Sequence, residues 1–143
     1  MLGDRFVQGR SKFSDHDPAR TEPVPKIYIR VRFGHLAEGS IAQVDTGAAW
    51  SVLAPRLAEK LGVYGQLGQR VKLSTRFGVH EGHLIRLSVT LVADEGDDLE
   101  TEGTFFVTRD WPSNVSFLGY SGLLANIRFA VDPQSNDFYF GDS

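Results

Sequence analysis

Short runs in which apolar residues occupy every second position constrain the fold of this chain more than any other feature. In the clearest run, residues 26–33, four apolar side chains (Ile27, Ile29, Val31 and Phe33) alternate with other side chains. A period of two residues is typical of a β-strand with one buried face. Further strand signals occur at residues 40–44, 69–73, 83–92, 101–108, 115–118, 129–131 and 138–140. The sequence therefore predicts an all-β domain.

Helical spacing is confined to two short segments. Leu53, Leu57 and Leu61 share one side of a predicted helix that ends at Gly62. Residues 121–126 form a second, shorter candidate. We expect one or two short helices beside the strands.

Residues 1–25 differ in composition from the remainder of the chain. They are polar, broken by prolines and without periodicity. This pattern predicts a flexible N-terminal tail over residues 1–25 and a single folded domain over residues 26–143.

Composition excludes several classes of function. The formal net charge of −3 gives no argument for nucleic acid or for an anionic membrane surface as a partner. The chain has no cysteine, which excludes disulfides, thiolate nucleophiles and cysteine-ligated metals. No apolar run approaches the roughly 18 residues of a membrane span, and the N-terminus has no apolar signal region. We expect a cytoplasmic protein.

Residues 42–48 contain the segment most suggestive of chemistry. Asp45 ends an apolar strand and is followed at once by Thr46, Gly47 and Ala48. A carboxylate at a strand end can lie in a cleft, and a glycine beside it permits a tight turn and close approach of a substrate. The tripeptide alone also fits an ordinary turn, because Asp and Gly are common turn residues.

The surrounding sequence favours the first reading. The segment resembles the active-site loop of retropepsin-like aspartic proteases, in which apolar residues precede Asp-Thr-Gly-Ala. The apolar pair Val52-Leu53 follows the loop, and Phe117-Leu118-Gly119 resembles the second glycine signature of that family. Leu123 and Leu124 match the apolar positions of the short helix after that signature. The order and spacing agree over residues 26–141.

This resemblance implies a closed β-barrel of the acid-protease fold, in its single-lobe, homodimeric form. The second signature would then thread past the catalytic loop, and the hairpin at residues 70–90 would be the flap that covers an extended peptide. The implied catalytic residues are Asp45, Thr46 and Gly47. The implied substrate-binding residues are Ala48 and Ala49 beside the loop, and Arg76, Phe77, Gly78 and Val79 at the hairpin tip. No metal and no organic cofactor is implied.

The chain has a single Asp-Thr-Gly. Aspartic proteases use two carboxylates that share one proton, and the pair titrates as a unit. A single chain of this length therefore predicts a symmetric homodimer that joins two copies of Asp45.

Two positions depart from the family pattern. Ala49 stands where many viral members have an acidic residue, and Tyr120 stands where many have an arginine. In those proteins the acid and the arginine pair across the dimer, so their joint loss leaves no unpaired buried charge. Ser121 stands where an Asp or Asn is common, and it preserves an N-cap. The alternative is a catalytically weak or inactive module of the same fold that binds peptides or dimerises.

Three further features have two readings each. His80, Glu81 and His83 suggest a metal site, but two ligands on a hairpin tip are too few. Trp50 either lines a substrate pocket or belongs to the core. Phe138 and Phe140 either pack in the core or form part of a dimer interface.

Overall fold

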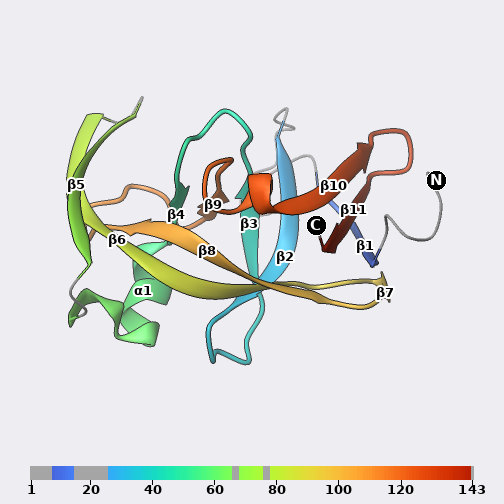
Figure 1. The fold of residues 1–143 in the computed structure, drawn as a ribbon, viewed down its shortest axis with the longest axis horizontal. Helices are drawn as coiled ribbons and strands as arrows, with labels where there is room; N and C mark the ends of the chain where they lie inside the picture. The colour runs from blue at the N-terminus through green and yellow to red at the C-terminus, as the bar shows by residue number, and fades with distance from the viewer. Residues whose placement is uncertain (1–7, 15–25, 66–67, 76–77, 143) are drawn as a thin grey trace.

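Strands dominate the computed structural model, which describes residues 8–14, 26–65, 68–75 and 78–142 (Figure 1). The elements in chain order are β1 (Gly9–Lys12), β2 (Ile27–Phe33), β3 (Ser40–Val44), β4 (Ser51–Val52), α1 (Pro55–Leu61), η1 (Val63–Gly65), β5 (Gln69–Thr75), β6 (Gly78–Leu91), β7 (Glu95–Gly96), β8 (Leu99–Val107), β9 (Ser116–Leu118), η2 (Leu124–Asn126), β10 (Ile127–Asp132) and β11 (Asp137–Asp142). The predicted all-β class is confirmed.

Six strands close into a barrel. The main sheet has the order β2-β3-β9-β4-β8-β6-β5, and an additional pairing of β2 with β6 closes the ring. Closure removes the exposed edges that an open sheet would have. Strand β5 pairs with β6 outside this ring, so the β5–β6 hairpin projects at one end of the molecule (Figure 1).

The apolar positions of the alternating runs fill the barrel. Val31 and Phe33 of β2 are fully buried, and the ring of Phe33 meets that of Phe105 edge-on at 5.5 Å. Burial of a large apolar side chain contributes about 1.5–3 kcal/mol relative to exposure, so a few such residues outweigh any single surface contact. The residues predicted to face inward along β2 do so because their period matches the pleat.

The C-terminal strands pack in the same core. Phe138 and Phe140 of β11 are fully buried, and Phe129 of β10 stacks on Phe138 with 6.0 Å between ring centroids. Of the two readings of Phe138 and Phe140, the structure supports core residues.

The prediction of a flexible tail is wrong for residues 9–12. These residues form β1, which pairs with β11 and β7 in a second sheet of order β10-β11-β1-β7. The strand has no apolar alternation, and strand pairing and ion pairs hold it in place. Lys12 Nζ lies 3.0 Å from Asp137 Oδ1, and a Cβ at Gly9 would overlap Asp97 O.

The helices are shorter than predicted. Helix α1 begins at Pro55, two residues after the predicted start at Leu53, because Leu53 and Ala54 are buried in extended backbone. Proline suits the first turn of a helix, and Gly62 ends the helix in the left-handed region with φ 68°. Only residues 124–126 of the second predicted helix are helical, as a 3-10 turn. Among the described residues, no helix has the length and apolar character of a membrane span.

Candidate active site

The loop that carries Asp45 connects β3 to β4, and β9 lies between these two strands. Val44 of β3 pairs with Leu118 of β9 in a parallel ladder, whereas Val52 of β4 pairs with Phe117 in an antiparallel one. The chain of the second glycine signature therefore passes between the two limbs of the Asp45 loop. This pairing confirms the predicted threading.

Backbone hydrogen bonds join the loop to the chain leaving β9. The Asp45 N–H donates to Leu118 O at 2.9 Å, and the Tyr120 N–H donates to Ala48 O at 2.8 Å. The Ser121 N–H donates to Ala49 O at 2.9 Å. The loop is thus held along its length, which restricts the positions available to the Asp45 side chain.

Gly119 permits this close approach. A Cβ at this position would lie 2.5 Å from both C and O of Trp50 and 2.9 Å from the N of Ser51. These are backbone atoms, which cannot rotate away from an added side chain. The Gly119 N–H also donates to the buried Ser51 Oγ at 2.9 Å. The glycine of the second signature is therefore required by contact with the first.

The Asp45 carboxylate is held by its own loop. The Gly47 N–H donates to Asp45 Oδ1 at 3.0 Å, and the Ala48 N–H donates to Asp45 O at 3.2 Å. Asp45 is half-buried, while Thr46 and Gly47 are exposed. A partly shielded carboxylate with a fixed orientation can exchange a proton with a bound molecule, which is the requirement for general acid–base chemistry.

The predicted site residues fall into two groups. Asp45, Thr46, Gly47, Ala48 and Ala49 share the loop, whereas Gly78 and Val79 begin β6 beside the hairpin tip. Arg76 and Phe77 lie outside the described residues. Figure 1 shows the loop between β3 and β4 and the end of the β5–β6 hairpin directed to the same side of the barrel.

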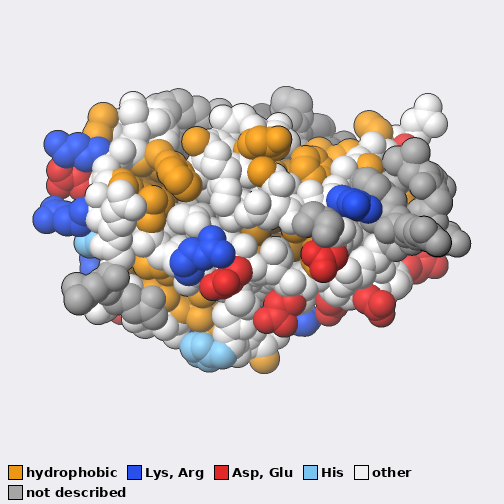
Figure 2. Space-filling model, in the orientation of Figure 1, with side chains coloured by type: hydrophobic (Ala, Val, Ile, Leu, Met, Phe, Trp, Pro, Cys, Tyr) orange, Lys and Arg blue, Asp and Glu red, His pale blue; other side chains and the backbone are white. Residues whose placement is uncertain are grey.

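The hairpin has one apolar and one charged face. Its register runs from Gln69↔Leu84 to Thr75↔Gly78. Glu81 lies 3.7 Å from Arg70 and 3.5 Å from Lys72 on the outer face, and Figure 2 shows basic and acidic side chains gathered at this end. Val79 is 66% exposed, and Gly78 has a φ of 109° that favours glycine.

The inner face of the hairpin covers a second apolar cluster. Buried Val52, Phe106 and Trp111 form its centre, with Val71, Leu73, Leu84 and Phe117 packed against them. Sequence reasoning did not single out Trp111. The sequence signal for such a cluster was the alternation of apolar residues in the two hairpin strands. It indicates that one face of the hairpin packs against another apolar surface.

The histidines of the hairpin lie on opposite faces. His80 is 7% exposed and faces inward, whereas His83, three residues further along the strand, is half-buried on the outer face. They cannot act as a chelating pair. No cluster of three or more candidate metal ligands occurs within residues 8–14, 26–65, 68–75 and 78–142.

Asp110 connects His80 to the loop after β8. His80 Nδ1 lies 3.3 Å from Asp110 Oδ1, and the Thr108 hydroxyl donates to the same oxygen at 2.6 Å. The Thr108 hydrogen bond is the main cause that holds the pKa of Asp110 below its ordinary value, and His80 adds to it. Asp110 therefore remains ionised under mildly acidic conditions.

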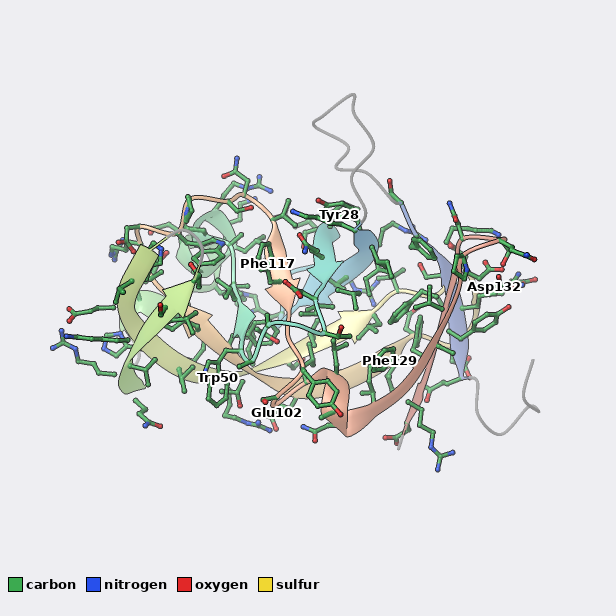
Figure 3. The ribbon with its side chains drawn as sticks, turned by 90° about the horizontal axis from the view of Figure 1, so that it is seen from above. Tyr28, Trp50, Glu102, Phe117, Phe129 and Asp132 are labelled. Atoms are coloured by element: carbon green, nitrogen blue, oxygen red, sulfur yellow. The ribbon has the colours of Figure 1, made fainter. Side chains whose placement is uncertain are left out.

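The residues that depart from the family pattern lie beside the loop. Tyr120 is 50% exposed, Ala49 is exposed, and Trp50 is half-buried. Figure 3 shows Trp50 on the face that carries the β3–β4 connection. Neither side chain is a carboxylate or a guanidinium, so Ala49 and Tyr120 cannot form a salt bridge.

Comparison with known proteins supports the fold but not a sequence family. No protein-family profile matches the sequence, and no curated protein matches it significantly. Among solved structures, a retropepsin-like aspartic protease from Rickettsia conorii is similar, with a TM-score of 0.53 and 21% sequence identity. The similarity covers 92% of this chain and 89% of the other. The chain therefore has the retropepsin-like fold, with Asp45 at the loop between β3 and β4.

Proposed function

We propose that this chain is an aspartic endopeptidase that acts as a homodimer. The observation that carries the proposal is the half-buried Asp45 in a loop whose two limbs lie on either side of β9, the strand of the second glycine signature. The likeness of the fold to a retropepsin-like aspartic protease supports it.

Two copies of Asp45 share one proton in the proposed mechanism. Carboxylates about 3 Å apart cannot both ionise, so one is a base and the other an acid. The base removes a proton from water, whose oxygen bonds to the scissile carbonyl carbon, while the acid protonates the carbonyl oxygen. The intermediate then transfers a proton to the amide nitrogen, the C–N bond breaks, and an acid and an amine are released.

The second carboxylate must come from another copy of the chain, because the sequence holds one Asp-Thr-Gly. Thr46, Gly47 and Ala49 are exposed beside Asp45, which makes this surface available for contact. By the family resemblance, the Thr46 hydroxyl bridges the two subunits, and Thr46 with Gly47 holds the loop. The expected assembly is a closed, two-fold symmetric dimer.

The proposed substrate is an extended peptide lying between the loop and the β5–β6 hairpin. Backbone hydrogen bonds would hold it as an added strand, with alternate side chains in apolar pockets. Ala48 and Ala49 would lie along the peptide, and the tip formed by Arg76, Phe77, Gly78 and Val79 would close over it and exclude water.

The alternative is a peptide-binding or dimerisation module of the same fold with weak or no catalysis. It is favoured by Ala49 and by the exposed Tyr120, which replace a charged pair of the family. The retained Asp45 favours the enzyme, since a binding module needs no carboxylate there.

Cleavage of an unfolded protein between pH 3 and pH 7 tests the proposal, with wild type and Asp45→Asn compared at several protein concentrations. We expect activity that rises more steeply than linearly with concentration and disappears in Asp45→Asn. Asp132→Asn is the matched control, because the Gln134 N–H donates to Asp132 Oδ1 at 3.0 Å in the same local geometry. Inactivity of the folded wild type at every pH would favour the binding module.

A further inference from the structure

Trp111 fills the space between the β5–β6 hairpin and the barrel floor, which is the apolar surface formed by Val52, Phe106 and Phe117. It lies in the connection between β8 and β9 and is 6% exposed. Its indole meets the ring of Phe117 edge-on, with centroids 5.6 Å apart, and the ring of His80 at 5.5 Å. Because His80 belongs to β6 and Phe117 to β9, the indole bridges the hairpin and the floor.

The floor beneath Trp111 adjoins the Asp45 loop. The Cα partners of Phe117 are Gln43, two residues before Asp45, and Val52, at the end of the same loop. Figure 3 shows Phe117 and Trp50 on the half of the molecule that also carries the β5–β6 hairpin.

The roof above Trp111 is the apolar inner face of the hairpin. Leu73 and His80 are Cα partners, and Leu73 and Leu84 are half-buried in the Trp111 cluster. A peptide lying between roof and floor would direct alternate side chains toward these residues. The indole contacts His80 on one side and Phe117 on the other, so a side chain directed between roof and floor would meet it.

We propose that Trp111 is a specificity-determining residue: it restricts one position of the bound peptide to a small side chain such as alanine. This inference rests on the proposed function, because it concerns the peptide proposed to lie between the Asp45 loop and the β5–β6 hairpin. His80 is a positioning residue for the indole, and its own place is set by Asp110, which faces His80 Nδ1 at 3.3 Å.

The size of the effect follows from the energetics of apolar pockets. A difference of one methylene in such a pocket changes discrimination by roughly 10–200-fold. Removal of an indole frees far more volume, so at least a tenfold change in preference, as an order-of-magnitude estimate, is expected.

The test maps cleavage sites in an unfolded protein by mass spectrometry, for wild type, Trp111→Phe and Trp111→Ala. A peptide pair based on a cleaved site, with Ala or Phe at the restricted position, then gives the ratio of kcat/KM values. We expect wild type to favour Ala, Trp111→Ala to shift toward Phe by at least about tenfold, and Trp111→Phe to lie between them. Equal loss of rate on both peptides, with the ratio unchanged, would assign Trp111 a structural role only and overturn the inference.

Trp111→Phe decides the question if Trp111→Ala does not fold, as judged by its thermal unfolding. A ratio equal to that of wild type in folded Trp111→Phe would then refute the inference.

Binding separates this inference from the proposed function. Capped alanine octapeptides with a reduced amide bond, carrying one Phe at each position in turn, are titrated calorimetrically into wild type and Trp111→Phe. Catalysis is not needed for this measurement. We expect one position at which Phe abolishes binding to wild type and is tolerated by the variant. Equal tolerance at every position, or no binding to either protein, would overturn the inference.

Discussion

Two aspartates in different parts of the molecule make the same local hydrogen bond. Asp45 Oδ1 accepts the N–H of Gly47, and Asp132 Oδ1 accepts the N–H of Gln134, each at 3.0 Å. Asp45 directly follows β3, and Asp132 is the last residue of β10. The local geometry of a carboxylate in a turn therefore does not distinguish a candidate catalytic residue from a turn residue.

The difference lies in what surrounds each turn. The two limbs of the Asp45 loop lie on either side of β9, and the loop accepts hydrogen bonds from Tyr120 and Ser121. The Asp132 turn joins β10 to β11, and Asp132 pairs with Asp137 at the end of that hairpin. Figure 3 shows Asp132 far along the molecule from Trp50 and Phe117. Tertiary context separates the two aspartates, and four measurements test this distinction.

The largest expected effect is on activity. Asp45→Asn is expected to lower the cleavage rate by at least about 10²-fold, since general acid–base catalysis contributes about 10²–10⁴-fold. Asp132→Asn is expected to leave the rate unchanged. Both variants should keep the unfolding free energy within about 0.5 kcal/mol of wild type, measured by urea denaturation. Equal rates for the two variants would remove the distinction between the turns.

The next largest effect is on stability. Gly119→Ala is expected to lower the unfolding free energy by about 3 kcal/mol, because the added Cβ overlaps the backbone of Trp50 and must displace it. Gly39→Ala is the control, since the nearest atom to its Cβ is Val31 O at 3.8 Å. Denaturant unfolding compares the two. A loss below about 0.5 kcal/mol for Gly119→Ala would contradict the required close approach.

A smaller effect is expected at Ser51. Its buried hydroxyl accepts the Gly119 N–H, so Ser51→Ala leaves a buried donor without that partner and should cost about 1–3 kcal/mol. Ser113→Ala is the comparison, because the half-buried Ser113 Oγ accepts the Val115 N–H at 3.1 Å. Its loss should lower the unfolding free energy by less than the loss of the Ser51 hydroxyl. Thermal unfolding of both variants gives the order. The reverse order would indicate that β9 and the loop are joined mainly by packing.

The smallest effect concerns the second sheet. The hydrogen bond from Lys12 is the main cause that holds the pKa of Asp137 below its ordinary value, and a hydrogen bond from Ser135 and the charge of Lys12 add to it. A carboxylate with a lowered pKa stabilises the fold above its unfolded value, near 3.9, and loses this contribution as pH falls through the folded pKa. The difference in Tm between wild type and Asp137→Asn should be present at pH 6 and shrink at pH 3. A difference independent of pH would show that charge is not involved.

Sequence reasoning succeeded where structure is local. The strand ending at Val44 was predicted with its observed bounds, because Asp-Thr-Gly interrupts the apolar alternation. Strands were predicted at residues 69–73 and 83–92, and the structure extends them, since β5 ends at Thr75 and β6 begins at Gly78. Strand β1 was missed, because its four polar residues are ordered by pairing with β11 at the other end of the chain.

The candidate site was predictable in part. Asp45 was identified from its neighbours in sequence, and Gly119 from its resemblance to a family signature. Trp111 and His80 were not identified as a contacting pair, since they belong to segments separated by the whole of β8. A buried tryptophan looks the same in a sequence whether it fills a barrel or covers a hairpin.

The β class, the turn at Asp45 and the single Asp-Thr-Gly could be predicted from the sequence, since each depends on residues within a few positions of one another. Three other features became visible in the folded chain: β9 passes through the Asp45 loop, the backbone of Trp50 leaves no room for a side chain at Gly119, and Trp111 lies beneath the hairpin. The physical reason is that turns and strands follow from local hydrogen bonds and side-chain periodicity, whereas burial and close approach depend on pairings between segments distant in the chain.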